Sequence, residues 1–288
     1  MQKITIGGVP EHFNLPWHLA IEEGKFQQKN VDLKWKEFPG GTGAMCTALR
    51  DGSIDAAIIL TEGIIKDIIN GNPSKIVKVY VESPLLWGIH VAAQSKFKTL
   101  KELKEARIAI SRFGSGSQLM AIVNAVNQGF DIDKLHYEIV NNLDGGIKAL
   151  TTNQADYFMW EHFTTKPLVD QGIFRRIDSI TTPWPCFVMA VRNEFLEDKS
   201  TYIKTVINVI NEQLKNYTRE HHNTALINLF SRRYAQKSID IEEWLSLTKW
   251  DSKKTISTEL INSIQNKLVN FNVIKKAIPN ERLIEKVF

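Results

Sequence analysis

Two stretches of the chain, ALRDGSIDAAIILTE at residues 48–62 and ALTTNQADYFMWEHF at residues 149–163, repeat one pattern at an interval of 101 positions. Both have an Ala-Leu pair followed by an aspartate at the same distance (Ala48, Leu49 and Asp55; Ala149, Leu150 and Asp156). Upstream, Glu37 corresponds to Glu138. Solenoid repeats are shorter and more numerous. The pattern therefore predicts two similar domains.

Around each stretch, short apolar runs alternate with longer amphipathic runs. This spacing predicts strands alternating with helices, first over residues 3–81 and again over residues 107–172. The predicted helices include residues 14–28, a short helix that stops at Gly52, and residues 161–172. Strands alternating with helices are typical of a parallel sheet covered on both faces. From about Thr201 onward the pattern is helical, with no strand signal.

Two proline-containing segments, 82–94 and 181–193, belong to neither repeat, and each ends in a strand-like run. We interpret them as crossings between two lobes. The predicted first lobe is residues 1–86 plus 189–288 with the helical tail, and the second is residues 87–188. Two lobes joined in this way are expected to close on a small molecule.

The composition argues against several classes of protein. The chain has 288 residues, a net charge of +4 and no long run of like charge, so we expect no nucleic-acid partner. No apolar stretch approaches 18 residues, so we expect no membrane insertion. The chain opens without a signal peptide. We therefore expect it to be periplasmic if a signal was removed, and cytoplasmic otherwise.

A further set of residues resembles a known superfamily. The matching positions in the first lobe are Pro16, Ala20, Gly24, Phe26, Gly40, Ala48, Leu49, Gly52, Asp55 and Ala56, and a Trp-Glu pair in the second lobe is Trp160 and Glu161. Over residues 3–195 the chain resembles type II periplasmic-binding proteins. It is most similar to the branch that contains alkanesulfonate and nitrate receptors and thiamine-pyrimidine-precursor proteins. The resemblance implies an α/β fold of two lobes, each a mostly parallel sheet flanked by helices, with a helical C-terminal tail.

The resemblance also implies a function. It predicts a solute-binding protein for a small-molecule ligand, either a thiamine-related pyrimidine or an organic anion such as a sulfonate. The implied protein partner is an ABC-transporter permease, and no cofactor is expected. The alternative is an enzyme of thiamine-pyrimidine synthesis or a menaquinone-precursor lyase or dehydratase. The consecutive cysteines of the pyrimidine synthases are missing, because Cys186 stands isolated in PWPCF. A regulator's sensor domain would need an N-terminal helix-turn-helix, and the chain opens on a strand.

Ligands of open parallel sheets lie beyond the carboxyl ends of the strands. In the second lobe this rule selects the turn RFGSGSQ, where glycines before a helix expose N–H groups to an anionic or carbonyl-bearing group. The predicted contacts are Arg112, Gly114, Ser115, Gly116, Ser117 and Gln118. The alternative interpretation is an ordinary strand-to-helix turn capped by serine.

In the first lobe the same rule selects the segments after three predicted strands. The candidates are His12, Phe13, Gly40, Gly41, Thr42, Thr61 and Glu62. The turn PGGTG lacks the Gly-Lys-Ser/Thr ending of a phosphate-binding loop. Glu62, like Glu161 in the second lobe, can accept hydrogen bonds from ring N–H or amino groups. The alternative is an acid that complements a helix dipole.

Four tryptophans lie near predicted strand ends and crossings. Trp87, Trp160 and Trp184 are candidates for stacking on a flat ring, whereas Trp17 is expected in the core.

The cysteines and the tail histidines are not candidates for chemistry. Cys46 is expected in a helix core and Cys186 lacks an evident base partner, while His221 and His222 are expected on the surface. No cluster of His, Cys or Asp has metal-binding spacing, so no metal is expected.

Overall fold

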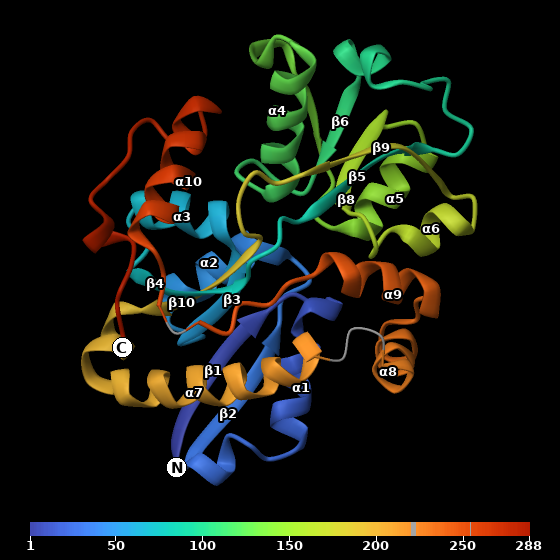
Figure 1. The fold of residues 1–288 in the computed structure, drawn as a ribbon. Helices are drawn as coiled ribbons and strands as arrows, with labels where there is room; N and C mark the ends of the chain where they lie inside the picture. The colour runs from blue at the N-terminus through green and yellow to red at the C-terminus, as the bar shows by residue number, and fades with distance from the viewer. Residues whose placement is uncertain (220–222, 254) are drawn as a thin grey trace. The chain divides into compact units, whose positions relative to one another are not determined.

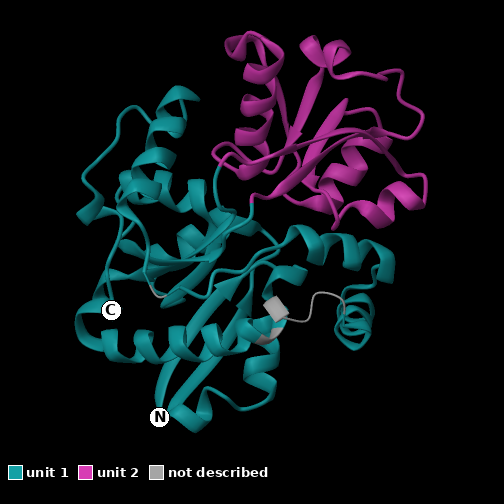
Figure 2. Cartoon of the chain, in the orientation of Figure 1, with its two compact units in different colours: residues 1–83, 184–288 teal, residues 84–183 magenta. Residues whose placement is uncertain are grey.

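The structure is a computed structural model that describes residues 1–219, 223–253 and 255–288. The chain folds into two compact units (Figure 2): unit 1 is Met1–Ser83 with Trp184–Phe288, and unit 2 is Pro84–Pro183. The boundaries predicted from the sequence, 86/87 and 188/189, lie a few residues further along the chain.

Unit 1 is built on a five-stranded sheet with the strand order β2-β1-β3-β10-β4. Four strands are parallel, and the fifth, β10, runs antiparallel between β3 and β4. The central strands are apolar throughout, as AAIIL in β3 shows, because helices cover both faces (Figure 1). The strands are β1 (Gln2–Gly8), β2 (Val31–Glu37), β3 (Ala56–Leu60), β4 (Ser74–Val81) and β10 (Phe187–Arg192).

The helices of unit 1 come from both ends of the chain. The first part supplies α1 (Leu15–Glu22), α2 (Gly41–Asp51) and α3 (Thr61–Ile69), together with the short turns η1 (His12–Asn14) and η2 (Gln27–Lys29). After β10 the chain forms α7 (Asn193–Arg219), α8 (Thr224–Tyr234), α9 (Ser238–Leu247) and α10 (Thr258–Asn270), followed by η5 (Asn280–Arg282). Figure 1 shows α1 and α7 on one side of the sheet and α2 and α3 on the other.

Unit 2 repeats this topology in a sheet of strand order β7-β6-β8-β5-β9. Its antiparallel member is β5, which lies between β8 and β9. The strands are β5 (Leu86–Ala92), β6 (Arg107–Ile110), β7 (His136–Ile139), β8 (Tyr157–Glu161) and β9 (Phe174–Thr181). They pack against α4 (Gly116–Gln128), α5 (Leu143–Thr151) and α6 (Lys166–Asp170), and the turns η3 (Leu100–Glu105) and η4 (Ile132–Lys134) complete the unit.

The two-lobed fold with a helical C-terminal tail confirms the fold expected from the sequence. Each sheet is mostly parallel, with one antiparallel strand. The 101-residue interval holds at the central strands, because the bounds of β3 (Ala56–Leu60) and of β8 (Tyr157–Glu161) differ by that number of positions.

Several local predictions were wrong. The helix predicted over residues 14–28 ends at Glu22, because Gly24 adopts a left-handed φ of 67° that terminates it. The helix predicted over 161–172 shrinks to α6, and strand β9 was not predicted. The helical tail begins at Asn193 rather than about Thr201, with a break in helical geometry at Lys199.

Candidate functional site

The predicted site residues follow the carboxyl ends of parallel strands in each unit. In unit 1, η1 follows β1, α2 begins shortly after β2, and α3 begins directly after β3. In unit 2, the turn before α4 follows β6, and the segment before α6 follows β8.

The turn before α4 is fixed by its own side chains. Ser115 caps the helix by accepting from the Gln118 amide at 3.3 Å, and the Ser117 hydroxyl accepts from the Ser111 amide at 2.9 Å. The Ser115 and Ser117 hydroxyl oxygens lie 3.0 Å apart, and both residues are buried. The Gln118 carboxamide oxygen accepts from the Gly114 amide at 2.6 Å. These groups hold a preorganised turn at the start of α4, where half-buried Arg112 and Gly116 also lie.

An aromatic pair next to this turn, in which Phe113 is exposed and Tyr137 is half-buried, was not predicted from the sequence. Phe113 is 63% exposed, and its ring lies 5.8 Å from that of Tyr137 on β7, edge to face. Burial raises the pKa of Tyr137, and a hydrogen bond with Gln118 opposes this shift. The signal was present, since Phe113 stands inside the turn, but only tryptophans were considered as stacking partners. An open ring beside a preorganised turn can stack on a flat ligand.

At the end of β8, Trp160 and Glu161 differ in exposure. Trp160 is half-buried and packs on Phe158 with ring centres 5.1 Å apart. Glu161 is buried, and its carboxylate accepts from the Thr164 amide at 2.6 Å. Burial raises the pKa of Glu161 to about 7, although backbone hydrogen bonds oppose it. Trp87 pairs with Glu161 across β5 and β8, is buried, and has an indole nitrogen without a hydrogen-bond partner among the described residues.

A second polar cluster in unit 2 was not predicted. Arg176 on β9 donates to the Nε2 atom of His162 at 2.6 Å and contacts Nε2 of His90 at 3.3 Å. Thr165 lies 2.9 Å from the same His90 nitrogen. Burial, followed by the charge of Arg176, lowers the pKa of His90 to about 3 and that of His162 to about 4. Both imidazoles are therefore neutral and are held in a hydrogen-bonded network, although Nδ1 of His90 has no hydrogen-bond partner among the described residues.

In unit 1, Glu62 and Trp184 form a buried pair. The Trp184 indole N–H donates to Glu62 Oε2 at 2.8 Å, and both residues are buried. Burial raises the pKa of Glu62 to about 7, and hydrogen bonds from its own amide and from Trp184 oppose the shift. The Trp184 ring packs edge-on to Phe271, with ring centres 6.4 Å apart. Trp184 was expected to present a stacking face, but the structure places its ring in the interior of unit 1.

The helix starts of α2 and α3 adjoin one another. A Cβ atom at Gly63 would clash with the methyl group of Thr42, so glycine is needed for this approach. Thr42 is buried, and its hydroxyl has no hydrogen-bond partner among the described residues. Thr61 is also buried, and its hydroxyl donates to the Pro185 carbonyl at 2.6 Å. Before α2, Gly40 is exposed and Gly41 has a left-handed φ of 66°.

His12 and Phe13 lie in an aromatic core. The His12 ring is 4.1 Å from the ring of Trp244, and burial lowers the pKa of His12 to about 3. The Phe13 carbonyl accepts from the Tyr80 hydroxyl at 2.7 Å and from the Trp250 indole at 3.2 Å. Sequence position alone placed both residues at a ligand edge. The structure covers them with the C-terminal helices.

The tryptophan and the two cysteines that were not predicted to bind a ligand are buried. Trp17 is fully buried, and Cys46 is buried in α2, which confirms both as core residues. Cys186 is also fully buried and in no disulfide, so its thiol faces no solvent. His221 and His222 lie outside the described residues. Among residues 1–219, 223–253 and 255–288, no group of His, Cys, Asp and Glu could hold a metal, and no helix is long and apolar enough to cross a membrane.

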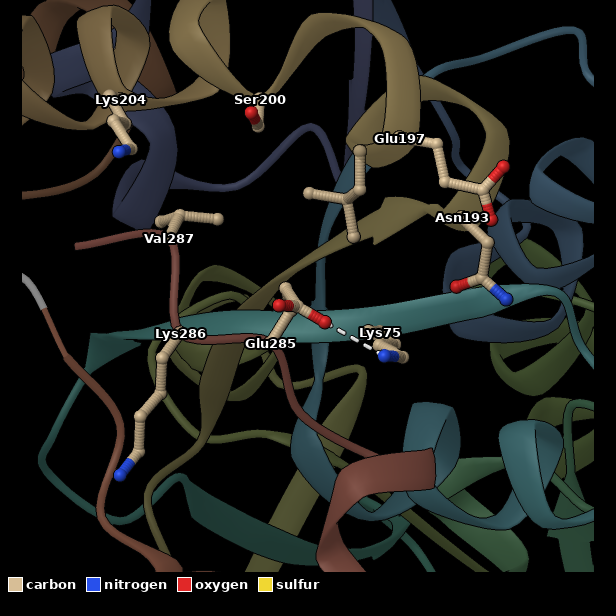
Figure 3. A pocket seen from close by; sticks show the side chains of 9 residues that line it. Lys75, Asn193, Glu197, Ser200, Lys204, Glu285, Lys286 and Val287 are labelled. Atoms are coloured by element: carbon tan, nitrogen blue, oxygen red, sulfur yellow. Dashed lines mark hydrogen bonds and ion pairs between the residues drawn. The ribbon is translucent and has the colours of Figure 1, made fainter.

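Unit 1 also has a pocket of about 450 Å³ at the other end of its sheet, where the parallel strands begin (Figure 3). It lies where β4 begins and α7 starts, and its wall is partly the C-terminal segment. Lys75 and Glu285 form an ion pair of 2.7 Å within it, and Figure 3 shows Lys204 and Glu197 on its rim. This mixed-charge pocket lies away from the strand ends where the predicted residues gather.

Comparisons with known proteins agree with the fold. A sequence model of the Ca3427-like PBP family matches residues 87–180, which is most of unit 2. A comparison with curated proteins found no match. Among solved structures, the Candida albicans CA3427 gene product, described as exhibiting the generic periplasmic binding protein fold, is 26% identical with a TM-score of 0.90. The match covers 99% of this chain and 97% of that one.

Two other solved structures are more distant. The alkanesulfonate-binding protein SsuA from Xanthomonas axonopodis pv. citri is 17% identical with a TM-score of 0.79, and the match covers 100% of this chain and 96% of that one. The nitrate-binding protein NrtA from Synechocystis PCC 6803 is 13% identical with a TM-score of 0.66, over 100% and 92% of the two chains. At these identities the likeness shows the fold alone.

Proposed function

We propose that the chain is a solute-binding protein that reversibly captures one small polar or heteroaromatic molecule, because unit 2 matches the Ca3427-like PBP family model and the whole chain shares the fold of the CA3427 gene product. The observation that supports this best is the turn of unit 2. Its serines and Gln118 are held by internal hydrogen bonds, and an open Phe113 ring stands beside it. A rigid polar turn next to an exposed ring binds a flat polar ligand with little ordering cost.

We assign roles to the residues of unit 2 on chemical grounds. Arg112 and the turn of residues 114–118 would anchor a polar or anionic group of the ligand, through the N–H groups of Gly116 and Ser117 rather than those of Gly114, Ser115 and Gln118, which donate within the turn. Trp160 and Phe113 would stack on a ring, and Glu161 would accept from a ring N–H or amino group. In unit 1, Gly40, Gly41, Thr42 and Glu62 follow the strand ends and are proposed as further contacts.

The preferred ligand class is a thiamine-related pyrimidine, and an organic anion such as a sulfonate is the second choice. Aromatic side chains at the unit 2 edge and two buried carboxyl groups favour a ring with N–H donors. The sulfonate alternative draws on Arg112 and the start of α4. We further propose that the bound solute is delivered to an ABC-transporter permease, which would place the protein outside the cytoplasmic membrane.

Thermal unfolding against pyrimidines, thiamine, alkanesulfonates, nitrate and carboxylates tests the proposal. A ligand at 100 times its dissociation constant should add about 2.7 kcal/mol of stability and raise the midpoint by several degrees. A pyrimidine should lose at least about tenfold in affinity on Trp160→Ala, since stacking and burial are removed together. The matched control is Lys104→Ala, which changes an exposed side chain of η3 in the same unit.

A shift with sulfonates alone, abolished by Arg112→Ala, would replace the pyrimidine with an anion while keeping solute binding. The absence of a shift with every compound would contradict solute binding of this kind. Closure of the units on the ligand stays a prediction, measured as a smaller radius of gyration by small-angle X-ray scattering when ligand is added.

A further inference from the structure

One buried carboxyl oxygen in unit 1, Oε1 of Glu62, has no hydrogen-bond partner within the described chain. Glu62 is 2% exposed, and its Oε2 atom accepts from the Trp184 indole at 2.8 Å. Its other oxygen, Oε1, is buried and makes no hydrogen bond within the described residues. A carboxyl group kept in this state carries a desolvation cost that a native fold rarely leaves unanswered.

No cation within the described residues neutralises this carboxyl group. Lys66 stands one turn along α3 but is not among the groups that act on Glu62. The groups that act on Glu62 are its own amide and the neutral indole of Trp184. Buried acids in proteins are normally paired with a cation or several donors. A donor on a bound molecule would satisfy this oxygen.

A second unused oxygen adjoins the same helix. Thr42 Oγ1 is buried without a partner in the described chain, and the Thr42 side chain lies against Gly63, the residue after Glu62. Both residues follow carboxyl ends of parallel strands, β2 for Thr42 and β3 for Glu62. The two unpartnered oxygens thus belong to adjoining helix starts at the strand edge where ligands of parallel sheets bind.

We propose that unit 1 recognises the nitrogen side of the ligand: Glu62 Oε1 accepts a hydrogen bond from an amino, amidine or ring N–H group, and the Thr42 hydroxyl bonds a neighbouring polar atom. This inference rests on the proposed solute-binding function and names its ligand class.

An oxyanion fits this edge less well than a nitrogen donor. The starts of α2 and α3 would attract an anion through their N–H groups. The Glu62 carboxyl already occupies the first turn of α3, so an incoming sulfonate or nitrate would meet a like charge in a desolvated setting. A donor nitrogen meets no such repulsion and gains a charge-assisted hydrogen bond.

The experiment measures the affinity of the full chain for matched probes by calorimetry at pH 8. The donor probe is 4-amino-2-methylpyrimidine, the donor-free probe is 4-methoxy-2-methylpyrimidine, and the oxyanion probe is ethanesulfonate. The amino probe should bind the unsubstituted protein at least about tenfold more tightly than the methoxy probe, as one charge-assisted hydrogen bond provides. Glu62→Gln should reduce that ratio to about threefold or less. The control Glu105→Gln, an exposed acid of unit 2, should leave it unchanged.

Each result decides the inference. If ethanesulfonate binds more tightly than the amino probe, or if the ratio survives Glu62→Gln, the donor-reading role is wrong while solute binding stands. If no probe binds the unsubstituted protein, the proposed function fails and the inference fails with it. Should Glu62→Gln not fold, the order of affinities in the unsubstituted protein still decides between a nitrogen donor and an oxyanion.

Discussion

The two units share a strand order but differ in what their strand ends present. In unit 1 the segments after β1 and β3 are buried, with His12 against Trp244 and Glu62 against Trp184. In unit 2 the segment after β6 stays open, and Phe113 is 63% exposed. The repeat thus preserves the scaffold, whereas the exposure of the residues that follow the strand ends differs between the units. A repeated sequence pattern locates a fold better than it locates a site.

The repeated aspartates show what the scaffold preserves. Asp55 accepts from the Thr5 amide at 2.8 Å, and its own amide donates back to the Thr5 carbonyl. Asp156 repeats this exchange with Arg107 at 2.7 Å and adds an ion pair of 2.9 Å with the Arg107 side chain. Each aspartate ties the start of its central strand to the neighbouring parallel strand, at Thr5 within β1 and at Arg107, the first residue of β6. The sequence repeat exists because both sheets need this lock.

The largest expected effect comes from a position where the repeat is broken. Ala44 in α2 corresponds to Gly145 in α5, and a Cβ atom at Gly145 would clash with the Val140 carbonyl. Gly145→Ala should therefore destabilise the protein by about 3 kcal/mol, since backbone cannot move aside easily. The reverse change, Ala44→Gly, should cost only about 1 kcal/mol through helix propensity.

Urea denaturation of both variants measures this difference. The dependence of the unfolding free energy on urea concentration should have the same slope in both variants, as two-state unfolding requires. Equal losses for the two changes would show that the Gly145 contact relaxes, and the comparison of the two helices would then lose its physical basis.

A smaller effect should follow from removing the buried acid of unit 1. The pKa of Glu62 lies at about 7 in the folded chain, above its ordinary value of 4.5. The folded state holds a proton that the unfolded state releases, so stability falls as the pH rises from 4.5 to 7. At about 1.4 kcal/mol per pH unit, the loss is on the order of 3 kcal/mol by pH 8.

Glu62→Gln should therefore be more stable than the unsubstituted protein at pH 8, by about 2 kcal/mol, and about equally stable at pH 4.5. Thermal unfolding across this range measures the gain. A gain that does not depend on pH would contradict titration of Glu62 as its source. Glu161, whose pKa also lies at about 7, provides the same test in unit 2 through Glu161→Gln.

The smallest effect concerns the two aspartate locks. Asp55→Asn should cost about 1 kcal/mol, because one backbone hydrogen bond to a charged group is weakened. Asp156→Asn should cost slightly more, since it also weakens the Arg107 ion pair, which is partly exposed. Denaturant midpoints of the two variants, and of the double variant, measure the costs, which should add because the locks lie in separate units. Losses that do not add would show that the two locks are coupled.

Much of the fold followed from the sequence because its signals are local. The central strands appeared as apolar runs, and the end of α2 appeared at Gly52, where a φ of 76° terminates the helix. Strand β9 escaped notice because FRRIDSIT places charged residues where an apolar run was sought. The helix predicted after β8 was too long, since neither its periodicity nor Pro167 fixed where it begins.

The candidate site was harder to predict because its contacts join distant residues. The strand-end rule selected Glu62 and Trp184 separately, but their hydrogen bond joins residues 122 positions apart. His12 followed a strand as expected, yet the C-terminal helices bury it, and only tertiary packing reveals this. The cluster of His90, His162 and Arg176 draws on three elements, one of them the unrecognised β9.

The placement of β10 has a consequence for how the chain is made. Unit 2 is one continuous stretch, Pro84–Pro183, whose antiparallel strand β5 is synthesised first. Unit 1 is begun earlier, but the centre of its sheet waits for β10, which ends at Arg192 and lies between β3 and β4. Because domains fold as units during synthesis, the second unit to emerge from the ribosome is the first with a complete sheet. Until residue 192 has been made, β3 and β4 each have a strand edge without the partner that β10 later provides, and such edges can pair with another chain.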